Sequence, residues 1–368
     1  MRFLYVTTIG GTMHFFKSLV YKLINEGHIV DIASNMIIQS PVDDCYKEWG
    51  CKLFQISCSR SPLNKGNIDA IREIKKLVSE NRYDIVHCHT PIAAACTRLA
   101  CRNVRKTGTK VIYTAHGFHF YQGAPLKNWL LFYPVEKLCS YFTDVLITIN
   151  KEDYKFAKSK LTTPNIQYVP GVGINVDRFA NTIIDTKKKR AEIGVPEQAY
   201  MLLSVGELNV NKNHQIVLKA LAQLKGTNIH YVIAGRGNQY NNLLTLASHL
   251  DIAEQIHLIG HRDDVAELYK AADAYLLPSI REGLNVSVME AMASGLPCII
   301  SDIRGNRDLI DEGKGGFLVN SMDERAFAEK ITNLKPYCSS FGKYNAQKAR
   351  IYNVKRINEE MKTIYQLL

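Results

Sequence analysis

The sequence predicts an α/β protein made of two doubly wound, Rossmann-like domains. Short apolar runs alternate along the chain with longer segments whose apolar residues recur every three or four positions, as they do in helices. Such strand–helix alternation is typical of a parallel sheet covered by helices on both faces. With 368 residues, the chain also exceeds the size at which one hydrophobic core keeps growing. Two domains are therefore expected.

Apolar runs mark the strands expected in each domain. Those of the first domain are residues 3–6, 29–33, 85–87, 111–114, 145–149 and 166–169. After a polar stretch at 184–192 the pattern restarts, with runs at 201–205, 230–234, 256–258, 274–277, 298–301 and 317–319. We expect the first domain to span residues 1–178 and the second 179–353. Residues 354–368 are predicted to form a terminal helix that packs back on the first domain.

Composition and cysteine usage indicate a cytoplasmic globular protein. Hydrophobic residues make up 46% of the chain and charged residues 22%, which is ordinary for this class. No run approaches the roughly 18 apolar residues of a membrane span, and the apolar N-terminus turns polar at Thr7, too early for a signal peptide. The nine cysteines are scattered without any C-x-x-C pair, which favours reduced, buried thiols. On a strand, His87 and His89 would share one face and Cys88 the other, so no metal site is expected there.

The positive charge is concentrated in the first domain. Residues 1–178 carry 23 Lys+Arg against 14 Asp+Glu, whereas the remainder carries 23 against 21. An acidic partner is therefore expected, either nucleic acid or an anionic membrane surface, although solvated helix faces account for part of the charge. Basic residues such as Arg98, Arg102 and Lys110 have no interleaved aromatic residues. Because single-stranded nucleic acid binds on aromatic stacking platforms, this spacing favours the membrane surface.

Two glycine turns follow predicted strands, where open parallel sheets bind ligands. Gly10-Gly11-Thr12 follows the first strand, and glycine allows close backbone approach to an anion at a helix N-terminus. A tight connection is the alternative for this turn. Gly235-Arg236-Gly237 follows another strand, but Tyr240 replaces the third glycine of a dinucleotide fingerprint. A nicotinamide-dependent enzyme is therefore disfavoured, and Gly235 remains a candidate ligand contact.

The most informative pattern is a pair of glutamates around a predicted helix start. Glu282 and Glu290 are eight residues apart, and a helix starting near Asn285 would place Glu282 in the preceding loop and Glu290 inside the helix. The residues between would then present free backbone N–H groups to phosphate or sugar oxygens, and these residues are Gly283, Leu284, Asn285 and Val286. Carboxylates suit sugar and ribose hydroxyls, which donate hydrogen bonds. A surface loop followed by a helix with solvated glutamates is the alternative.

These residues resemble the nucleotide-sugar signature of the family 4 retaining glycosyltransferases. Glu282-x7-Glu290, with Gly283 after the first glutamate, continues as EAMASGLP from Glu290, and VGELNVNK at 205–212 is similar to the family's phosphate-binding turn. YTAHGFHFY at 113–121 resembles the segment that carries the family's active-site histidine. Together with QGAPLK at 122–127, it is most similar to enzymes of bacterial capsule or exopolysaccharide synthesis. The resemblance covers nearly the whole chain.

The resemblance implies the GT-B fold, in which two Rossmann-like domains face each other across a deep cleft and the second holds the donor. It places Lys212 on the leaving diphosphate, Glu290 on the ribose hydroxyls, and Glu282 with the 283–286 backbone on the donor sugar and phosphates. His116 would lie near the donor sugar and Gly11 near the diphosphate. His261 and Arg262, just after a strand, would meet the base, although a simple turn is equally compatible with that segment.

One position departs from the family pattern. Many members carry an arginine where this chain has Glu207, five residues before Lys212. Because a carboxylate cannot stabilise a diphosphate by charge, the second cation would have to come from elsewhere, with Arg236 and Arg262 as candidates. Glu207 could instead orient Lys212. The chain also contains no D-x-D pair, so no metal ion or other cofactor is expected, and positive side chains and helix N-termini would take that role.

The function implied is transfer of a hexosyl or N-acetylhexosaminyl group from a UDP-sugar to a lipid-linked saccharide, with retention of configuration. The acceptor would be a polyprenyl diphosphate saccharide at the inner face of a bacterial membrane, where the protein would bind peripherally. Two alternatives remain open. A nucleotide-sugar epimerase of GT-B architecture would convert its substrate without an acceptor, and a non-catalytic protein would bind the donor without releasing UDP.

Overall fold

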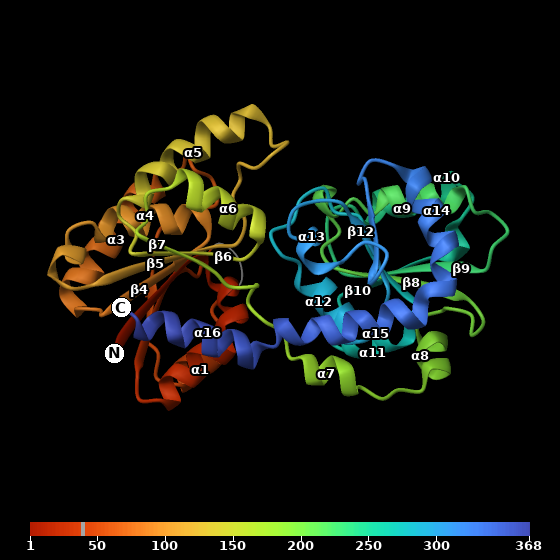
Figure 1. Cartoon of the computed structure of the whole chain (residues 1–368), viewed down its shortest axis with the longest axis horizontal. Helices are drawn as coiled ribbons and strands as arrows, with labels where there is room; N and C mark the ends of the chain where they lie inside the picture. The colour runs from red at the N-terminus through yellow and green to blue at the C-terminus, as the bar shows by residue number, and fades with distance from the viewer. Residues whose placement is uncertain (38–40) are drawn as a thin grey trace. The chain divides into compact units, whose positions relative to one another are not determined.

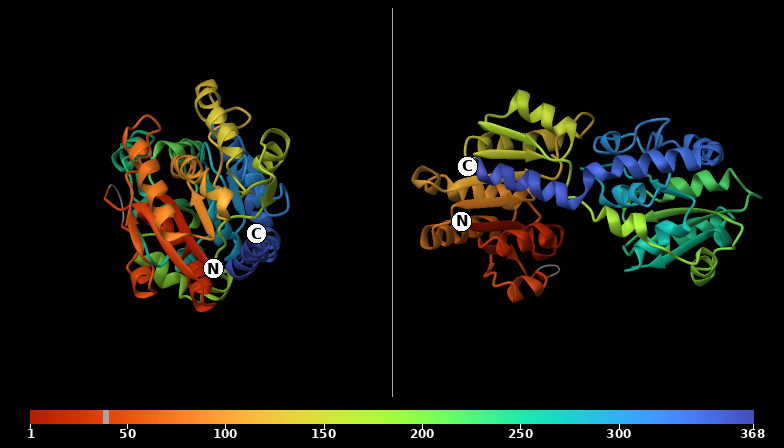
Figure 2. Two further views of the ribbon diagram at one scale, coloured as in Figure 1. Left: turned by 90° about the vertical axis from the view of Figure 1, so that its left-hand side faces the viewer. Right: turned by 60° about the horizontal axis from the view of Figure 1, so that its bottom comes forward.

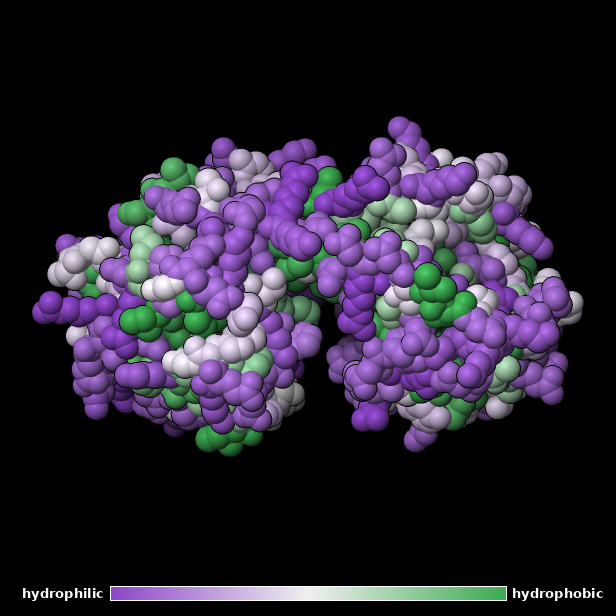
Figure 3. All heavy atoms as spheres, turned by 90° about the horizontal axis from the view of Figure 1, so that it is seen from below, coloured by the Kyte–Doolittle hydropathy of each residue, from purple (hydrophilic) through white to green (hydrophobic). Residues whose placement is uncertain are grey.

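The computed structural model describes residues 1–37 and 41–368 and divides into two compact units. Unit 1 comprises Met1–Val172 and Ile357–Leu368, and unit 2 comprises Gly173–Arg356. The division lies a few residues before the boundary at 178 expected from the sequence. Both chain ends lie close together on unit 1 (Figures 1 and 2). On the face shown in Figure 3, hydrophilic side chains cover most of each unit and hydrophobic ones form small separate patches.

Unit 1 is built on a seven-stranded, all-parallel sheet in the order β3-β2-β1-β4-β5-β6-β7. Its strands are β1 (Arg2–Ile9), β2 (Ile29–Asn35), β3 (Leu53–Gln55), β4 (Ile85–His89), β5 (Lys110–Ala115), β6 (Val145–Thr148) and β7 (Asn165–Tyr168). The sequence analysis identified six of them and missed β3. This edge strand has only three residues, two half-buried and one exposed, so it lacks the continuous apolar run of a fully buried strand.

Helices cover both faces of this sheet, as the strand–helix alternation predicts. The helical segments of unit 1 are η1 (Gly10–Phe16), α1 (Lys17–Asn25), α2 (Cys45–Glu48), α3 (Gly66–Asn81), α4 (Pro91–Cys101), η2 (Val104–Thr107), α5 (Leu126–Ser140), α6 (Lys151–Lys160) and the terminal α16 (Val354–Gln366). One hydrophobic core lies between the sheet and the layer of α3, α4, α5 and α6, and a second lies between the sheet and α1 and α16 (Figure 1).

Unit 2 contains a six-stranded parallel sheet in the order β10-β9-β8-β11-β12-β13. All six strands were expected from the sequence, and they are β8 (Tyr200–Val205), β9 (Ile229–Ala234), β10 (Ile256–Gly260), β11 (Ala274–Leu277), β12 (Cys298–Ser301) and β13 (Gly316–Val319). The helical segments are α7 (Val176–Asn181), α8 (Thr186–Glu192), η3 (Val210–Lys212), α9 (Gln215–Ala222), α10 (Tyr240–His249), η4 (Ala253–Gln255), α11 (Val265–Ala271), α12 (Val286–Ala293), α13 (Asn306–Leu309), α14 (Glu324–Leu334), η5 (Lys335–Tyr337), α15 (Cys338–Ala349) and η6 (Arg350–Tyr352). The main core lies between the sheet and α9, α10 and α14. Both units are therefore doubly wound Rossmann-like domains, as predicted.

Most of the cysteines lie in the hydrophobic cores, as their apolar sequence surroundings predict. Seven of the nine cysteines are buried, and all nine are free thiols. Cys88 packs in the core under α4, whereas His87 and His89 lie on the other face of β4 with ring centroids 4.1 Å apart, as the strand geometry predicts. Among the helices that the structure describes, none combines the length and apolar character needed to span a bilayer.

Candidate active site

The candidate site of unit 2 lies at the point where the strand order reverses. In the sheet, β8 lies between β9, the next strand in sequence, and β11. The chain therefore leaves β8 toward one side of the sheet and leaves β11 toward the other, and the connections after these two strands diverge around a crevice. Lys212 lies in the connection after β8, and Glu282 lies in the connection after β11. The topology thus brings together two residues that are 70 positions apart.

Lys212 is held over a glycine turn and paired with Glu282. Asn209 caps η3 by accepting a hydrogen bond from the backbone N–H of Lys212 at 3.0 Å, which fixes where this side chain starts. The Lys212 side chain then passes over Gly206, where a Cβ would lie 3.3 Å from Cε of Lys212. Nζ of Lys212 donates to Oε1 of Glu282 at 2.8 Å. Both side chains are mostly shielded, with exposed fractions of 16% and 14%, so this charge pair is screened less than a surface pair.

Glu207, the unusual residue of this turn, is hydrogen-bonded to Asn209. Its Oε2 accepts a hydrogen bond from Nδ2 of Asn209 at 2.9 Å, so it supports the residue that caps η3. The carboxylate that pairs with Lys212 belongs to Glu282 instead. Because Asn209 also accepts a hydrogen bond from the N–H of Lys212, Glu207 is linked to Lys212 through Asn209, and a role for Glu207 in orienting the lysine stays a prediction.

Backbone contacts lock the two connections together. Nδ2 of Asn211 donates to the carbonyl of Arg281 at 2.9 Å, and the N–H of Ile280 donates to the carbonyl of Asn211 at 2.8 Å. Gly305, after β12, approaches so closely that a Cβ would lie 2.0 Å from the carbonyl oxygen of Gly283. Its φ of +76° is also one that favours glycine. The loop carrying Glu282 and Gly283 is thus fixed from both sides.

The N-terminus of α12 lies directly after this loop. Asn285 is its N-cap, and its side-chain oxygen accepts from the N–H of Val288 at 3.3 Å and from the Ser287 hydroxyl at 2.6 Å. The helix start expected near Asn285 is confirmed. Backbone N–H groups of the first helical turn lack intrahelical partners and carry partial positive charge. Together with Lys212, the segment 283–286 therefore provides groups that can bind an anion.

Glu290 sits inside α12 in an environment that favours its neutral form. Burial raises the pKa of the Glu290 carboxyl to about 7, and the Tyr269 hydroxyl, which donates to Oε2 at 3.0 Å, opposes that rise. A carboxyl group poised near neutral pH and held by one donor is suited to accept further hydrogen bonds from ligand hydroxyls. Perturbed pKa values of this kind are typical of functional sites.

Three further candidates of unit 2 have different surroundings. Gly235 is a point of close backbone approach, because a Cβ there would lie 1.8 Å from the carbonyl oxygen of Gly206. His261 is exposed after β10, with Nε2 3.4 Å from a carboxylate oxygen of Asp263. Arg262 donates from Nε to Asp264 at 2.7 Å and also pairs with Glu192. Its guanidinium is thus already occupied by two carboxylates, which leaves the exposed Arg236 as the better candidate for a second cation.

In unit 1, the candidate residues also lie around a reversal of strand order, between β1 and β4. Gly11 lies in η1, directly after β1. His116 follows β5, and its Nε2 is 3.2 Å from Nδ1 of His89 at the end of β4. Burial lowers the pKa of His116 to about 4, so this imidazole is neutral at physiological pH. The His89 contact therefore constrains the tautomer and the orientation of His116.

His89 is positioned by packing and by a strained neighbour. Its ring stacks on Phe16 at a centroid distance of 4.1 Å, and its Nε2 is buried without a hydrogen-bond partner. Thr90 has a φ of +64°, a left-handed conformation that β-branched residues rarely adopt. The Thr90 hydroxyl accepts from the N–H of Thr8 at 3.1 Å, which ties the connection after β4 to the end of β1. Strain of this kind is common where a site must be held in place.

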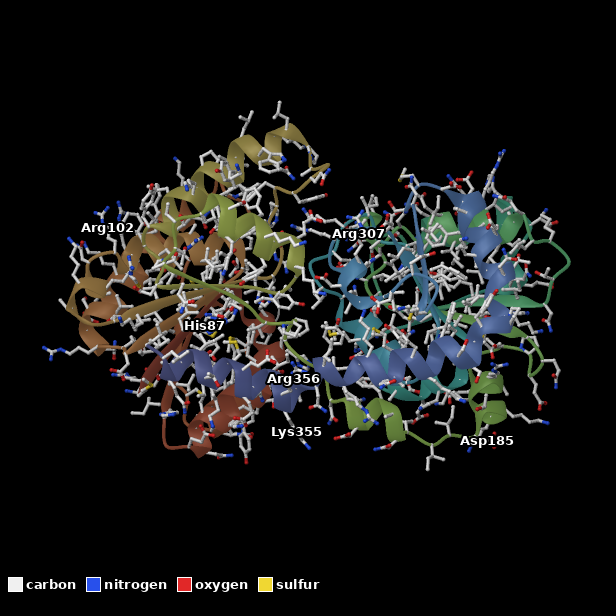
Figure 4. All side chains as sticks on the ribbon, in the orientation of Figure 1. His87, Arg102, Asp185, Arg307, Lys355 and Arg356 are labelled. Carbon is white, nitrogen blue, oxygen red and sulfur yellow. The ribbon has the colours of Figure 1, made fainter. Side chains whose placement is uncertain are left out.

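A buried hydrogen-bond chain links His87, whose ring packs against that of His89, to the C-terminal helix. His87 lies between the sheet and α16 (Figure 4), with Nδ1 2.7 Å from the Tyr365 hydroxyl and Nε2 2.8 Å from the Thr114 hydroxyl. The Tyr365 hydroxyl is also 2.6 Å from that of Tyr5. A hollow of about 30 Å³, room for about one water molecule, lies beside His87, His89 and His116.

Residues that support the candidate side chains were not predicted from the sequence. His89 was considered only as a metal ligand. Its position at the carboxyl end of a predicted strand, where parallel sheets bind ligands, could have marked it as a candidate site residue. Tyr269 and Gly305 gave no such signal, because their contacts with Glu290 and Gly283 depend on tertiary packing.

Comparisons with known proteins agree with this architecture. Residues 185–346 match the family described as glycosyl transferases group 1, and residues 3–150 match the family described as glycosyl transferase 4-like. The chain is 42% identical over 320 residues to the putative glycosyltransferase EpsD of Bacillus subtilis (strain 168), covering 85% of this chain and 84% of that protein.

A second relative and a solved structure extend the comparison. The UDP-Gal:alpha-D-GlcNAc-diphosphoundecaprenol alpha-1,3-galactosyltransferase of Escherichia coli is 28% identical over 282 residues, covering 73% of this chain and 72% of that protein. The crystal structure of Anabaena HepE in complex with UDP superposes with a TM-score of 0.83 at 16% identity, covering 100% of both chains. This protein therefore belongs to the group 1 glycosyltransferases, with a glycosyl transferase 4-like first half and the GT-B fold.

Proposed function

We propose that this protein is a retaining glycosyltransferase that moves a hexosyl or N-acetylhexosaminyl group from a UDP-sugar to a lipid-linked saccharide. The acceptor is a polyprenyl diphosphate saccharide, and the product enters a bacterial surface polysaccharide such as a capsule or exopolysaccharide. The observation that carries the proposal is the convergence of Lys212, Glu282 and the N-terminus of α12 at the strand-order reversal of unit 2. Glu290 lies one turn further along the same helix.

Each of these groups has a role in donor chemistry. Lys212 neutralises the diphosphate, whose negative charge grows as the glycosidic bond breaks, and the 283–286 backbone adds N–H donors. Glu290 accepts hydrogen bonds from the ribose hydroxyls, and Glu282 accepts them from the sugar. His116, neutral and fixed by His89, contacts the donor sugar from unit 1. Positive side chains and helix N-termini stabilise the leaving group in this scheme, so neither a metal ion nor another cofactor is required.

The acceptor assignment is supported by a relative and by charge. The Escherichia coli relative is named for an acceptor that carries GlcNAc on diphosphoundecaprenol. The basic excess of residues 1–178 suits both a diphosphate and the anionic inner face of a membrane. We propose that unit 1 binds this acceptor and associates peripherally with that face.

Acceptor-dependent release of UDP tests the proposal. UDP-glucose, UDP-galactose and their N-acetylated counterparts are each incubated with the protein, with and without GlcNAc-diphosphoundecaprenol in detergent. We expect UDP to be released and a disaccharide lipid to form with at least one donor, and only when the acceptor is present. Conversion of the donor without acceptor would indicate an epimerase, and donor binding without turnover would indicate a non-catalytic protein.

Sedimentation with vesicles tests the membrane part separately. We expect the protein to sediment with vesicles that contain phosphatidylglycerol and to stay in the supernatant with neutral phosphatidylcholine vesicles. Because the attraction is electrostatic, binding should fall as salt is raised. Equal and negligible binding to both vesicle types would rule out this part of the proposal.

A further inference from the structure

Unit 1 contains a second, larger pocket whose wall is mainly apolar. Its volume is about 200 Å³, and it is lined by the segment 62–67, by α4, by residues 118–120 and by α5. The apolar side chains of its wall include Leu63, Ile92, Ala95, Phe120, Leu131 and Val135. An apolar cavity of about 150 Å³ holds a ligand the size of benzene, so this pocket has room for a short stretch of branched hydrocarbon.

Two polar side chains in the wall, those of Glu136 and Asn67, are already hydrogen-bonded. Glu136 accepts hydrogen bonds from both terminal nitrogens of Arg98, at 2.5 and 3.1 Å, and this ion pair is buried. The Asn67 side chain accepts from the N–H of Ser59 and donates to the carbonyl of Ser61, both at 2.9 Å. A sugar or a nucleotide base would have to break these bonds to be recognised, which costs free energy. Hydrocarbon would not.

Exposed apolar residues occur in the pocket lining and on α5, the helix that supplies part of that lining. Leu63 is 84% exposed, and Leu126 and Leu130 on α5 are 73% and 70% exposed. α5 forms the outer edge of its helix layer (Figure 1), so these side chains are not covered within unit 1. Large apolar side chains this exposed beside an apolar pocket are consistent with an interaction site.

Basic residues lie in two segments that supply part of the pocket lining. The segments 57–67 and 118–133 contain Arg60, Lys65 and Lys127, and all three side chains are exposed. The acidic side chains nearby are already engaged, Glu73 by Ser57 and Glu136 by Arg98. A ligand that combines hydrocarbon with negative charge therefore fits both the wall and these segments.

We propose that this pocket binds the isoprenoid chain of the lipid-linked acceptor next to its diphosphate, with Arg60, Lys65 and Lys127 facing the phosphates. The inference rests on the proposed function and adds where the lipid is held. The position is consistent with that role, because the pocket wall includes Phe118, two residues after His116 in the connection after β5. The isoprenoid chain, the diphosphate and the reacting sugar of the acceptor would then lie one after another along the same edge of the sheet.

The test uses farnesyl diphosphate, a soluble isoprenoid diphosphate, and a tryptophan near the pocket. The chain contains only Trp49 and Trp129, and the Trp129 ring lies 5.6 Å from that of Phe120 in the pocket wall. In a Trp49→Phe background, farnesyl diphosphate should change Trp129 fluorescence in a saturable way without any donor present. Inorganic diphosphate and dodecyl phosphate are the controls. An equal response to inorganic diphosphate, or to dodecyl phosphate, would overturn the isoprenoid assignment.

Two phenylalanine substitutions locate the binding. Ala95→Phe fills the pocket and should weaken farnesyl diphosphate binding about tenfold, because apolar contact area with the ligand is lost. Leu138→Phe, on the exposed part of α5 outside the pocket, should leave binding unchanged. If circular dichroism shows that Ala95→Phe is unfolded, Leu131→Asp at the pocket wall takes its place, with the same expected loss. Wild-type affinity in the folded pocket variant would overturn the proposal.

Turnover separates this inference from the proposed function. With GlcNAc-diphosphoundecaprenol as acceptor, Ala95→Phe should raise the acceptor KM and leave both kcat and thermal stabilisation by UDP near wild-type values. An unchanged acceptor KM, with transfer intact, would refute the pocket and leave the function standing. Farnesyl diphosphate binding that depends on Ala95, in a protein without transferase activity, would refute the function and leave the pocket standing.

Discussion

Nζ of Lys212 lies 2.8 Å from Oε1 of Glu282, so the lysine best placed to bind a diphosphate is already paired with a carboxylate. Both residues come from connections that meet where the strand order of unit 2 reverses. A diphosphate bound here would be attracted by Lys212 and repelled by Glu282. If the proposed function holds, we expect Glu282 to weaken binding of the nucleotide alone, and we expect a donor sugar that hydrogen-bonds to Glu282 to compensate for that cost.

Replacing Glu282 by glutamine should separate these two effects. Glu282→Gln removes the competing charge and should tighten UDP binding about fivefold, a change of about 1 kcal/mol for one partly shielded charge. Turnover of the UDP-sugar should fall, because an amide at position 282 is a weaker hydrogen-bond acceptor for the sugar hydroxyls than the carboxylate. Isothermal titration with UDP measures the first effect, and UDP release measures the second. Lys212→Met is the matched variant and should lose UDP affinity and turnover by about 100-fold or more. Weaker UDP binding by Glu282→Gln would mean that Glu282 contacts the nucleotide directly.

Glu290 should make nucleotide binding depend on pH around neutrality. Burial raises the pKa of its carboxyl to about 7 in the free protein. Ribose hydroxyls that donate to it would favour the ionised form and lower that pKa, so UDP binding should release protons. Affinity for UDP should therefore rise as the pH is raised from 6 to 8, by at most about tenfold per pH unit.

Glu290→Gln provides the control for this pH dependence. The phosphates of UDP titrate in the same way with either protein, so only the difference between the two titration series reports on Glu290. Calorimetry in buffers with different ionisation enthalpies should show proton release with the wild type and less with the variant. Identical pH profiles for both proteins would argue against a contact between Glu290 and the ribose.

Gly235 should be far more sensitive to substitution than a glycine in open space. A Cβ at Gly235 would lie 1.8 Å from the carbonyl oxygen of Gly206, the turn under Lys212. Gly235→Ala must displace backbone and should destabilise unit 2 by about 3 kcal/mol, with loss of UDP binding. Gly226→Ala is the matched control, because its φ is +82° but nothing lies within 4 Å, and it should cost only about 1 kcal/mol. Thermal unfolding followed by circular dichroism compares the two, and equal destabilisation would contradict the packing argument.

Local patterns allowed much of the fold to be predicted. The six strands of unit 2 are continuous apolar runs, and the start of α12 follows from Asn285, whose side chain caps the helix it precedes. β3 was missed because an edge strand that is only half-buried has no such run. An element could be predicted when its own residues formed a continuous apolar run or a helix cap, and it was missed when they did not.

The surroundings of the candidate residues could not be predicted in the same way. Arg262 is occupied by Glu192, which lies 70 residues earlier, and Lys212 is paired with a glutamate 70 residues later. Neither partner can be read from spacing, because a parallel sheet joins loops that are distant in sequence. The resemblance to known enzymes indicated candidate residues, whereas the ion pairs, the close glycine contacts and the His89–His116 contact required the structure.

The buried histidines of unit 1 should make it sensitive to mild acid. Burial lowers the pKa of His87 to about 3 and of His116 to about 4, and it lowers the pKa of His89 well below its usual value. The unfolded chain titrates near pH 6.5, so below that pH it binds protons that the folded unit does not. The stability contribution of these groups is complete above about pH 6.5 and is lost as the pH falls toward 4, by up to about 1.4 kcal/mol per pH unit for each histidine. Glu290 acts in the opposite direction between about pH 7 and 4.5, but it belongs to unit 2.

Tryptophan fluorescence isolates this effect, because Trp49 and Trp129 both belong to unit 1. Urea unfolding followed by fluorescence should give a free energy of unfolding that falls steadily between pH 6.5 and 4.5. His87→Gln should reduce the slope of this dependence by about one third, since it removes one of three similar proton uptakes. His249→Gln, at an exposed position of unit 2, should leave the slope unchanged. A wild-type slope in His87→Gln would contradict this argument. It would mean that His87, hydrogen-bonded to Tyr365 and through it to Tyr5, takes up the same number of protons in the folded and the unfolded protein over this pH range.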